Sequence, residues 1–174
     1  GRIGRHRVHR VETARIPNIH LHTYSEVESV DGMIGNFKVR IREHARYVTN
    51  ECNGCGACFD VCPAFGPDEF NEGLNSRKAI YVAFTQAVPS MAQIDMDQCI
   101  KCGACKTACE LNAIDFDQQD TLVDLEIGSI IVATGWDEYE PDHGYLGYGE
   151  YPNVITQMKL ERILAPNGPT VGHL

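Results

Sequence analysis

The sequence predicts an α+β fold in which a cysteine-rich unit lies between segments that form β-structure. Two cysteine runs with identical spacing, which begin at Cys52 and Cys99, indicate an internal repeat. Alternating apolar and polar residues at 19–42 indicate a β-hairpin before the repeat. A continuous apolar run at 130–133 indicates a fully buried parallel strand after it. At 174 residues, the chain can form one domain or two small ones.

The first segments are expected to form a helix end and the hairpin. Segment 8–15 can close a helix, because the Ile-Pro-Asn triplet that follows would stop it. The hairpin should consist of strands at 19–30 and 37–42. Segment 31–36 should join them, because its Asp, Gly and Asn residues are typical of turns.

Three histidines lie near this hairpin and are candidates for metal ligands. His20 and His22 would point to one face of the first strand, and His44 follows the second strand. The sequence places no cysteine or carboxylate partner near them, so they are interpreted as surface histidines.

Both cysteine runs have the spacing C-x2-C-x2-C-x3-C, and together they contain all 8 cysteines. A cubane [4Fe–4S] cluster needs four thiolates, and a tight loop with cysteines three residues apart provides three of them. The fourth cysteine lies one helical turn further on and reaches the other cluster. The predicted ligands are Cys52, Cys55, Cys58 and Cys109 for the first cluster, and Cys62, Cys99, Cys102 and Cys105 for the second.

Zinc sites and disulfides agree less well with this spacing. Structural zinc favours two separated C-x2-C pairs and has no tetrahedral use for a third cysteine at the same short spacing. Disulfides between cysteines three residues apart would be strained, and two identical runs indicate a repeat rather than a disulfide framework. Gly54, Gly56 and Gly103 suit loops whose backbone approaches inorganic sulfide, where φ can be positive.

Short strands should flank the cysteine runs. Segment 45–49 precedes the first run, segment 94–96 precedes the second, and segment 113–116 follows it. The strand, cysteine loop and helix therefore occur twice, which is the repeat of a bacterial-type two-cluster ferredoxin. The linker 63–98 is long for a minimal ferredoxin, and its apolar segment 79–84 is compatible with either helix or strand.

The composition argues against several protein classes. No apolar run approaches the roughly 20 residues of a membrane span, and the basic start lacks the apolar segment of a signal peptide. The net charge of −9 argues against nucleic acid as a partner, because its binding depends on cationic contacts. The start without Met predicts a fragment or processed product, and cluster cysteines predict the cytoplasm of an anaerobic cell.

The segments outside the ferredoxin unit resemble the β-meander and following strand of flavoproteins with two dinucleotide-binding domains. The resemblance rests on the hairpin, on a further strand at 122–127, and on the apolar run that ends in Ala-Thr-Gly at 133–135. It implies an α/β FAD-binding fold with the ferredoxin inserted between the second and third meander strands. Such an insertion is feasible because the first and last strands of a ferredoxin pair. The implied domain boundaries are 1–43, 44–118 and 119–174.

Longer stretches resemble the heterodisulfide reductase family, and within it the A subunits, which carry FAD and iron–sulfur clusters in methanogens and related anaerobes. The resemblance runs from about residue 18 onward and is carried by segments 47–63, 68–74, 77–81, 86–89, 99–109, 130–135 and 148–155. It implies electron transfer between a donor enzyme, the flavin and heterodisulfide-reducing subunits. It also implies flavin-based bifurcation toward ferredoxin in complexes with a hydrogenase or a formate dehydrogenase.

The same resemblance assigns FAD contacts to Val27, Thr134 and Gly135, although ordinary strand packing remains an alternative for them. The chain has no G-x-G-x-x-G fingerprint, which would place the FAD pyrophosphate on a helix N-terminus. The FAD site is therefore expected to be only partly present, and binding of FAD to this chain to be weak. Glu161, in a helix expected at 156–164, is interpreted as a solvated residue.

The predicted function is electron transfer through two clusters to or from FAD in an oxidoreductase subunit, with no catalytic residue in this segment. A free-standing two-cluster carrier is an alternative, but it would need neither segment 19–42 nor segment 121–135. Further alternatives are a zinc-stabilised interaction module and a component that serves membrane quinones in sulfate reducers.

Overall fold

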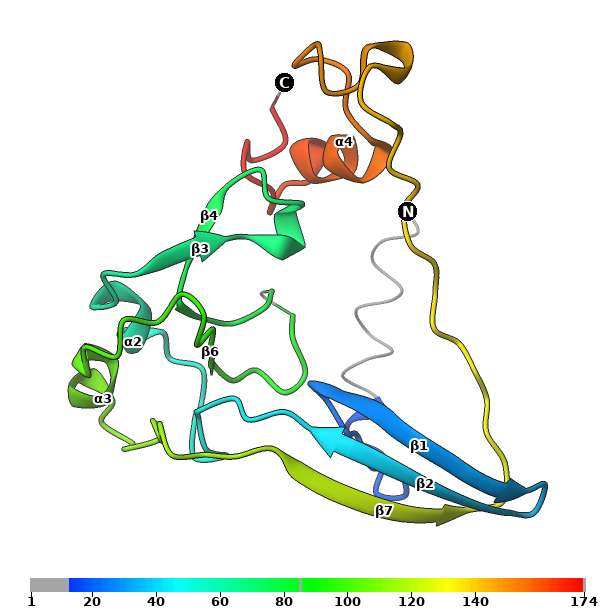
Figure 1. Ribbon diagram of the computed structural model, residues 1–174. Coiled ribbons are helices and arrows are strands. Elements are labelled where there is room, and N and C mark those ends of the chain that lie inside the picture. The colour runs from blue at the N-terminus through cyan, green and yellow to red at the C-terminus, as the bar shows by residue number, and fades with distance from the viewer. Residues whose placement is uncertain (1–12, 85, 174) are drawn as a thin grey trace. The chain divides into compact units, whose positions relative to one another are not determined.

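The computed structural model describes residues 13–84 and 86–173, and Figure 1 shows their arrangement. The chain divides into two compact units: the first comprises 1–64 and 78–131, and the second comprises 65–77 and 132–174. The predicted helix end at 8–15 falls largely outside the described residues. Across the described ranges, no helix has both the length and the apolar character that crossing a bilayer requires.

The first unit contains a three-stranded antiparallel sheet (Figure 1). Its strands are β1 (Ser25–Met33), β2 (Asn36–Glu43) and β7 (Thr121–Ile127), in the order β1-β2-β7. The hairpin predicted at 19–42 is therefore present, but its first strand starts later than predicted. Tyr24 has a φ of 58°, which interrupts the extended backbone just before β1 begins.

The hairpin turn is also tighter than predicted. The strands run on until Met33 pairs with Asn36, so only two residues lie between them. Gly32 has a φ of 99°, and a Cβ at this position would lie 2.2 Å from the carbonyl oxygen of Asn36. The glycine at 32 thus permits a close approach of two strands, where the sequence indicated a wider turn.

The cysteine-rich segment leaves and re-enters this sheet at adjacent positions. Glu43 at the end of β2 pairs with Thr121 at the start of β7, although the whole segment 44–120 lies between them. The strands predicted at 45–49 and 113–116 are reduced to one antiparallel bridge, between Val48 and Ile114. The topology is that of a segment inserted between neighbouring strands of an antiparallel sheet.

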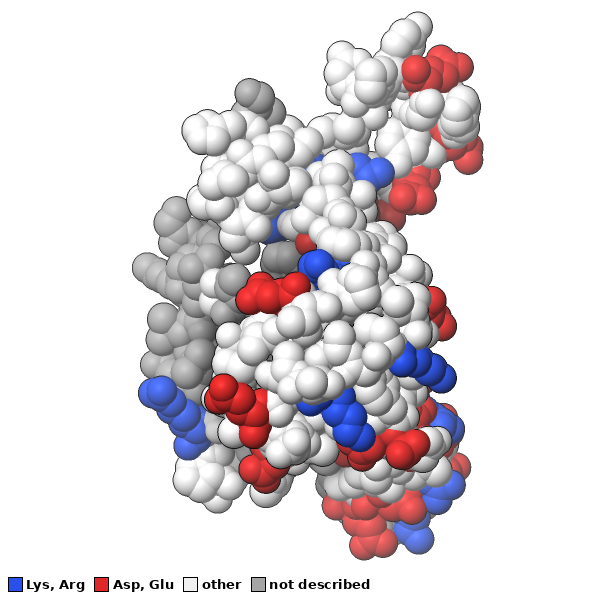
Figure 2. Space-filling model, turned by 90° about the vertical axis from the view of Figure 1, so that its left-hand side faces the viewer, with Lys and Arg blue, Asp and Glu red and all other residues white. Residues whose placement is uncertain are grey.

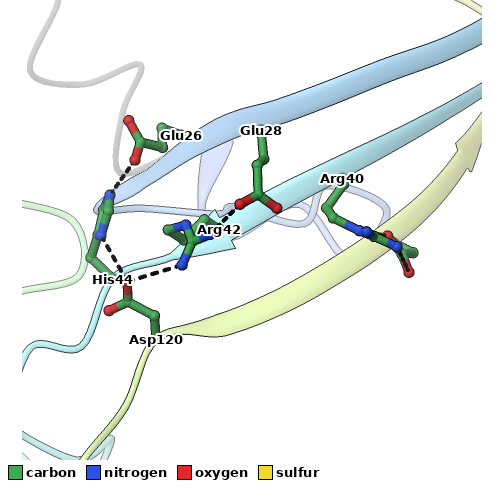
Figure 3. Close-up of polar contacts among 7 residues, drawn as sticks. Glu26, Glu28, Arg40, Arg42, His44 and Asp120 are labelled. Atoms are coloured by element: carbon green, nitrogen blue, oxygen red, sulfur yellow. Dashed lines mark hydrogen bonds and ion pairs between the residues drawn. The ribbon is translucent and has the colours of Figure 1, made fainter.

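Charged side chains connect the three strands on one face of this sheet (Figure 3). Arg40 of β2 donates to Asp124 of β7 through two nitrogens, at 2.7 and 3.1 Å. Arg42 of β2 donates to Glu28 of β1. Hydrogen bonds from the Arg40 guanidinium hold the pKa of the Asp124 carboxyl below its usual range. Because these groups are exposed, each pair contributes little to stability.

A second group of contacts joins the two ends of the inserted segment (Figure 3). Asp120 accepts a hydrogen bond from the backbone N–H of Ala45 at 2.9 Å, which keeps the pKa of its carboxyl below the usual range. The carboxylate of Asp120 also lies 3.4 Å from Nδ1 of His44, and Nε2 of the same ring lies 3.1 Å from Glu26 of β1.

These contacts correct the expectation that the histidines lack carboxylate partners. His22 lies 2.7 Å from Glu43, and His44 lies between Glu26 and Asp120. The partners were not apparent because they come from residues far away in the sequence. His20 and His22 also precede β1, so they are not on a strand.

The ferredoxin-like part contains two short helices, α2 (Ala57–Asp60) and α3 (Ala104–Ala108), and a two-stranded sheet of β5 (Ile80–Tyr81) and β6 (Gln93–Ile94). The apolar segment at 79–84 thus begins as a strand. Most of the buried apolar core of the described residues lies here. Ile80 and Val48 are 1% exposed, and Ala113 is fully buried.

The second unit combines residues 65–77 with the C-terminal segment. Its elements are β3 (Phe65–Pro67), β4 (Ser76–Lys78, whose last residue belongs to the first unit), the 3-10 turns η1 (Glu69–Asn71) and η2 (Tyr145–Gly147), and helix α4 (Gln157–Leu164). The predicted helix at 156–164 is confirmed: Thr156 caps it by accepting from the backbone N–H of Lys159, and Glu161 is exposed. The buried Arg162 donates to Asn71 at 2.9 Å and so joins the two segments.

The prediction of a fully buried strand at 130–133 is wrong for this structure. Residues 130–133 are not in a strand, and Ile131 and Val132 are 92% and 76% exposed. A parallel strand is buried only when neighbouring strands pair with it and helices cover its faces. Among the described residues, none of the sheets includes this segment.

Candidate metal centres

The eight cysteines gather in two groups of four, and each group surrounds its own hollow in the first unit. The first cysteine group is Cys52, Cys55, Cys58 and Cys109. The second cysteine group is Cys62, Cys99, Cys102 and Cys105. Each group takes three cysteines from one run and the fourth from the other. The groups have the same members as the predicted ligand sets, and ligation itself stays a prediction.

The loops of the two runs have matching backbone conformations. Gly56 and Gly103 both adopt left-handed φ values, 87° and 78°, and immediately precede α2 and α3. Two residues after the first cysteine of each run, Gly54 has a φ of 71° and Lys101 a φ of 54°. These turns wrap the first three cysteines around one hollow. The helix that follows carries the fourth cysteine toward the other hollow.

Backbone N–H groups point at three of the sulfur atoms. Gly54 donates to Sγ of Cys52 at 3.4 Å, and Lys101 donates to Sγ of Cys99 at the same distance. The N–H of Ala113 lies 3.3 Å from Sγ of Cys109. Donors of this kind stabilise a negative sulfur, which is the form that binds iron.

Burial opposes thiolate formation where the sulfurs lie deepest. Burial raises the pKa of the Cys58 thiol to about 12, and the nearby thiols of Cys52, Cys105 and Cys55 add to the shift. The pKa of Cys105 is raised for the same reason, with Cys99, Cys62 and Cys102 as its neighbours. These buried sulfurs are protonated at neutral pH without metal. A bound metal deprotonates its thiol ligands, so loading these groups releases protons.

The arrangement of the thiols suits an iron–sulfur cluster in each hollow. All eight cysteines are free, so none forms a disulfide. Within the described part of the chain, no three His, Cys, Asp or Glu side chains converge on a point where one metal ion would bind. Four thiols around a hollow suit a cubane, whose iron atoms occupy separate corners.

Each group has a buried side and an exposed side. Cys58, Cys62 and Cys105 are buried, whereas Cys55 of the first group and Cys102 of the second are exposed. Apolar side chains close the buried sides, with Ala92 and Ile114 at the first hollow and Ile80 and Ile94 at the second. Each group therefore has one cysteine at the surface and apolar side chains on its opposite side.

The residues predicted to contact FAD lie outside these hollows. Val27 is 60% exposed in β1 of the first unit, and Thr134 and Gly135 are exposed in the second unit. Their role stays a prediction. Sequence reasoning missed a different residue: the ammonium of Lys78 donates to the backbone carbonyl of Cys62 at 2.7 Å. No sequence signal marks this contact, because Lys78 lies in the linker.

Comparisons with known proteins agree with the cysteine arrangement. The family model for the 4Fe-4S dicluster domain matches residues 48–113. The chain is 52% identical over 165 residues to the iron-sulfur A subunit of the CoB–CoM heterodisulfide reductase of Methanocaldococcus jannaschii, covering 94% of the chain and 25% of that protein. It is 48% identical over 164 residues to the A subunit of the H(2):CoB-CoM heterodisulfide,ferredoxin reductase of Methanothermobacter marburgensis. This match covers 93% of the chain and 25% of that protein.

A third relative is named only as similar to such an A subunit. This protein of Archaeoglobus profundus is 44% identical to the chain over 190 residues, covering 94% of the chain and 27% of the relative. The chain thus spans about a quarter of the length of these curated relatives.

Proposed function

On the premise that this chain is a homologue of the heterodisulfide reductase A subunit, corresponding to about a quarter of its length, we propose that it transfers electrons to or from FAD through two [4Fe–4S] clusters. The observation that carries the proposal is the crossed grouping of the eight cysteines around two separate hollows. A cubane in each hollow would accept and release one electron at a time.

The chain's own residues would bind and shield the clusters. The cysteine sulfurs would bind iron, and the N–H groups of Gly54, Lys101 and Ala113 would stabilise the sulfur charge. Apolar side chains such as Ile80 and Ile114 would exclude water from the buried sides. The crossed connection also keeps the groups close, since the Cys105 thiol is near enough to raise the pKa of Cys58 in the other group.

Metal analysis tests the proposal. Prepared without oxygen, the protein segment should contain about eight irons and about eight acid-labile sulfides, because each of two cubanes holds four. Iron, zinc and labile sulfide would be measured on the same sample. Stoichiometric zinc without labile sulfide would refute the iron–sulfur function and support the zinc-stabilised module instead.

We also propose that segments 1–43 and 119–174 belong to an FAD-binding domain and that segment 44–118 is a ferredoxin domain inserted in it. The adjacency of β2 and β7 supports this division, because the inserted segment starts and ends beside one sheet. FAD would then contact Val27, Thr134 and Gly135.

A titration tests how much of the FAD site this chain holds. The 174-residue chain is expected to bind FAD weakly or not at all, because it has no glycine-rich loop to bind the pyrophosphate at a helix N-terminus. Flavin fluorescence during equilibrium titration measures the affinity. Tight binding at one FAD per chain would show that the fingerprint is dispensable and that the dinucleotide site lies elsewhere.

The names of the relatives indicate the partners we propose. The name of the Methanothermobacter marburgensis relative mentions hydrogen, ferredoxin and the CoB–CoM heterodisulfide, and the name of a further relative also mentions formate. We propose that the complete protein works in the cytoplasm of an anaerobic cell. It would work with other heterodisulfide reductase subunits and with a hydrogenase or formate dehydrogenase, bifurcating electrons toward ferredoxin. In the assembled complex, reduction of a heterodisulfide but not of a quinone analogue would separate this assignment from the quinone-linked alternative.

A further inference from the structure

The two cysteine groups differ in the charge held beside them. Lys78 ends β4, and the next two residues, Ala79 and Ile80, line the hollow of the second group. The half-buried ammonium of Lys78 donates to the backbone carbonyl of Cys62 at 2.7 Å. A positive charge is thereby fixed against the backbone of a second-group cysteine.

The equivalent position in the other repeat has a neutral donor. Cys109, the fourth cysteine of its run as Cys62 is of the first run, belongs to the first group. Its carbonyl accepts from the backbone N–H of Asn112 at 3.1 Å. The two repeats therefore match in loop geometry and differ at this carbonyl, where one has an ammonium and the other a peptide N–H.

The other charges near the groups are either exposed or matched between the repeats: a half-buried aspartate, Asp95 or Asp115, directly follows the isoleucine that lines the second or the first hollow. Four exposed charged residues flank the cysteines. They are Lys101 and Lys106 beside the second group, and Glu51 and Glu110 beside the first group. In the lower part of Figure 2, acidic and basic side chains are interspersed on the surface. Solvent and salt screen exposed charges within about 10 Å at 0.1 M ionic strength, whereas a half-buried charge is screened less.

Hydrogen bonds to sulfur favour reduction of the first group rather than the second, but a peptide dipole has a weaker effect than a full charge. Peptide N–H groups donate to Cys52 and Cys109 of the first group and to Cys99 of the second, and a backbone hydrogen bond also acts on Cys58 of the first group and on Cys105 of the second. Hydrogen bonds and net charge both set the reduction potential of a cluster. One additional peptide dipole favours reduction of the first group, and an ammonium favours reduction of the second group more strongly.

We propose that Lys78 makes the cluster of the second group the more easily reduced of the two and so sets the direction of electron transfer. The proposal rests on the proposed function. One electron leaves the first group and enters the second, with no bond made and no proton transferred. Exposed Cys55 then marks the side where electrons enter and exposed Cys102 the side where they leave. Lys78 acts through the position of its positive charge, because its ammonium contacts the backbone of Cys62 and not the sulfur.

The test compares variants of the complete cluster-loaded protein by redox titration monitored by paramagnetic resonance. Lys78→Met should lower the reduction equilibrium constant of the second group at least tenfold, which is about 59 mV for one electron. The first group should stay unchanged. Lys78→Arg keeps the charge and should retain the potential. Lys106→Met removes an exposed lysine from α3 and is the matched control, with an expected change below threefold.

Single variants Cys55→Ser and Cys102→Ser identify the signals, since each changes the spectrum of its own group. In the unmodified protein, the first electron should enter the group that Cys102→Ser perturbs, a result that does not require a stable Lys78→Met variant. Equal shifts in both groups, no shift, or first reduction at the Cys55 group would overturn the proposal. These results would leave the proposed function intact as long as the iron content remains about eight.

Discussion

Replacing Cys62 with serine is expected to damage the cluster of the second group and to leave the first group loaded. Cys62 belongs to the first cysteine run, but it lines the hollow formed with Cys99, Cys102 and Cys105. Its removal should lower the iron content from about eight to about four per chain, because one cubane loses a ligand that no nearby cysteine replaces. Iron analysis measures the loss, and paramagnetic resonance of the reduced protein identifies the missing signal.

Cys109→Ser is the reciprocal variant. Cys109 belongs to the second run but lines the first hollow, so its loss should remove the other signal. The two variants should therefore have similar iron contents and complementary spectra. Loss of the first-group signal in Cys62→Ser would refute the crossed assignment and would mean that each run binds its own cluster.

Gly54→Ala should destabilise the protein strongly and reduce loading of the first group. Gly54 has a φ of 71°, and a Cβ there would lie 2.7 Å from the backbone carbonyl oxygen of Ser90. Left-handed backbone costs an L-residue about 1–2 kcal/mol, and overpacking a fixed backbone adds about 1–3 kcal/mol. Iron retention and denaturant unfolding of the loaded protein measure the two effects.

Gly73→Ala separates strain from crowding. Gly73 has a φ of 70°, nearly that of Gly54, but a Cβ there meets nothing within 4 Å. This variant should lose only the stability that the left-handed backbone costs an alanine, and it should keep its iron. The second repeat already tolerates a side chain at the position equivalent to Gly54, where Lys101 has a φ of 54°. If both alanine variants lost the same stability, contact with Ser90 would not explain the glycine at 54.

The sequence determined those features that depend on neighbouring residues. The spacing of the cysteines places the first three of each run around one hollow and directs the fourth away from it, because turns and one helical turn carry the chain over short distances. The capped helix at 156–164 and the hairpin could likewise be predicted, since capping and alternation are local patterns. The limits of the hairpin were less predictable, because the φ of Tyr24 and the close approach at Gly32 do not appear in a pattern of polarity.

Only the tertiary structure decided which distant segments meet. It placed Lys78 against Cys62, Ser90 against Gly54, and β2 beside β7. It also left the apolar residues at 130–133 exposed, where their pattern indicated a buried strand. Local spacing limits the conformations of a few adjacent residues, whereas these contacts depend on the path of a long linker and on which surfaces find partners. Short-range sequence therefore specified the cysteine loops, and long-range packing specified the charges and close contacts around them.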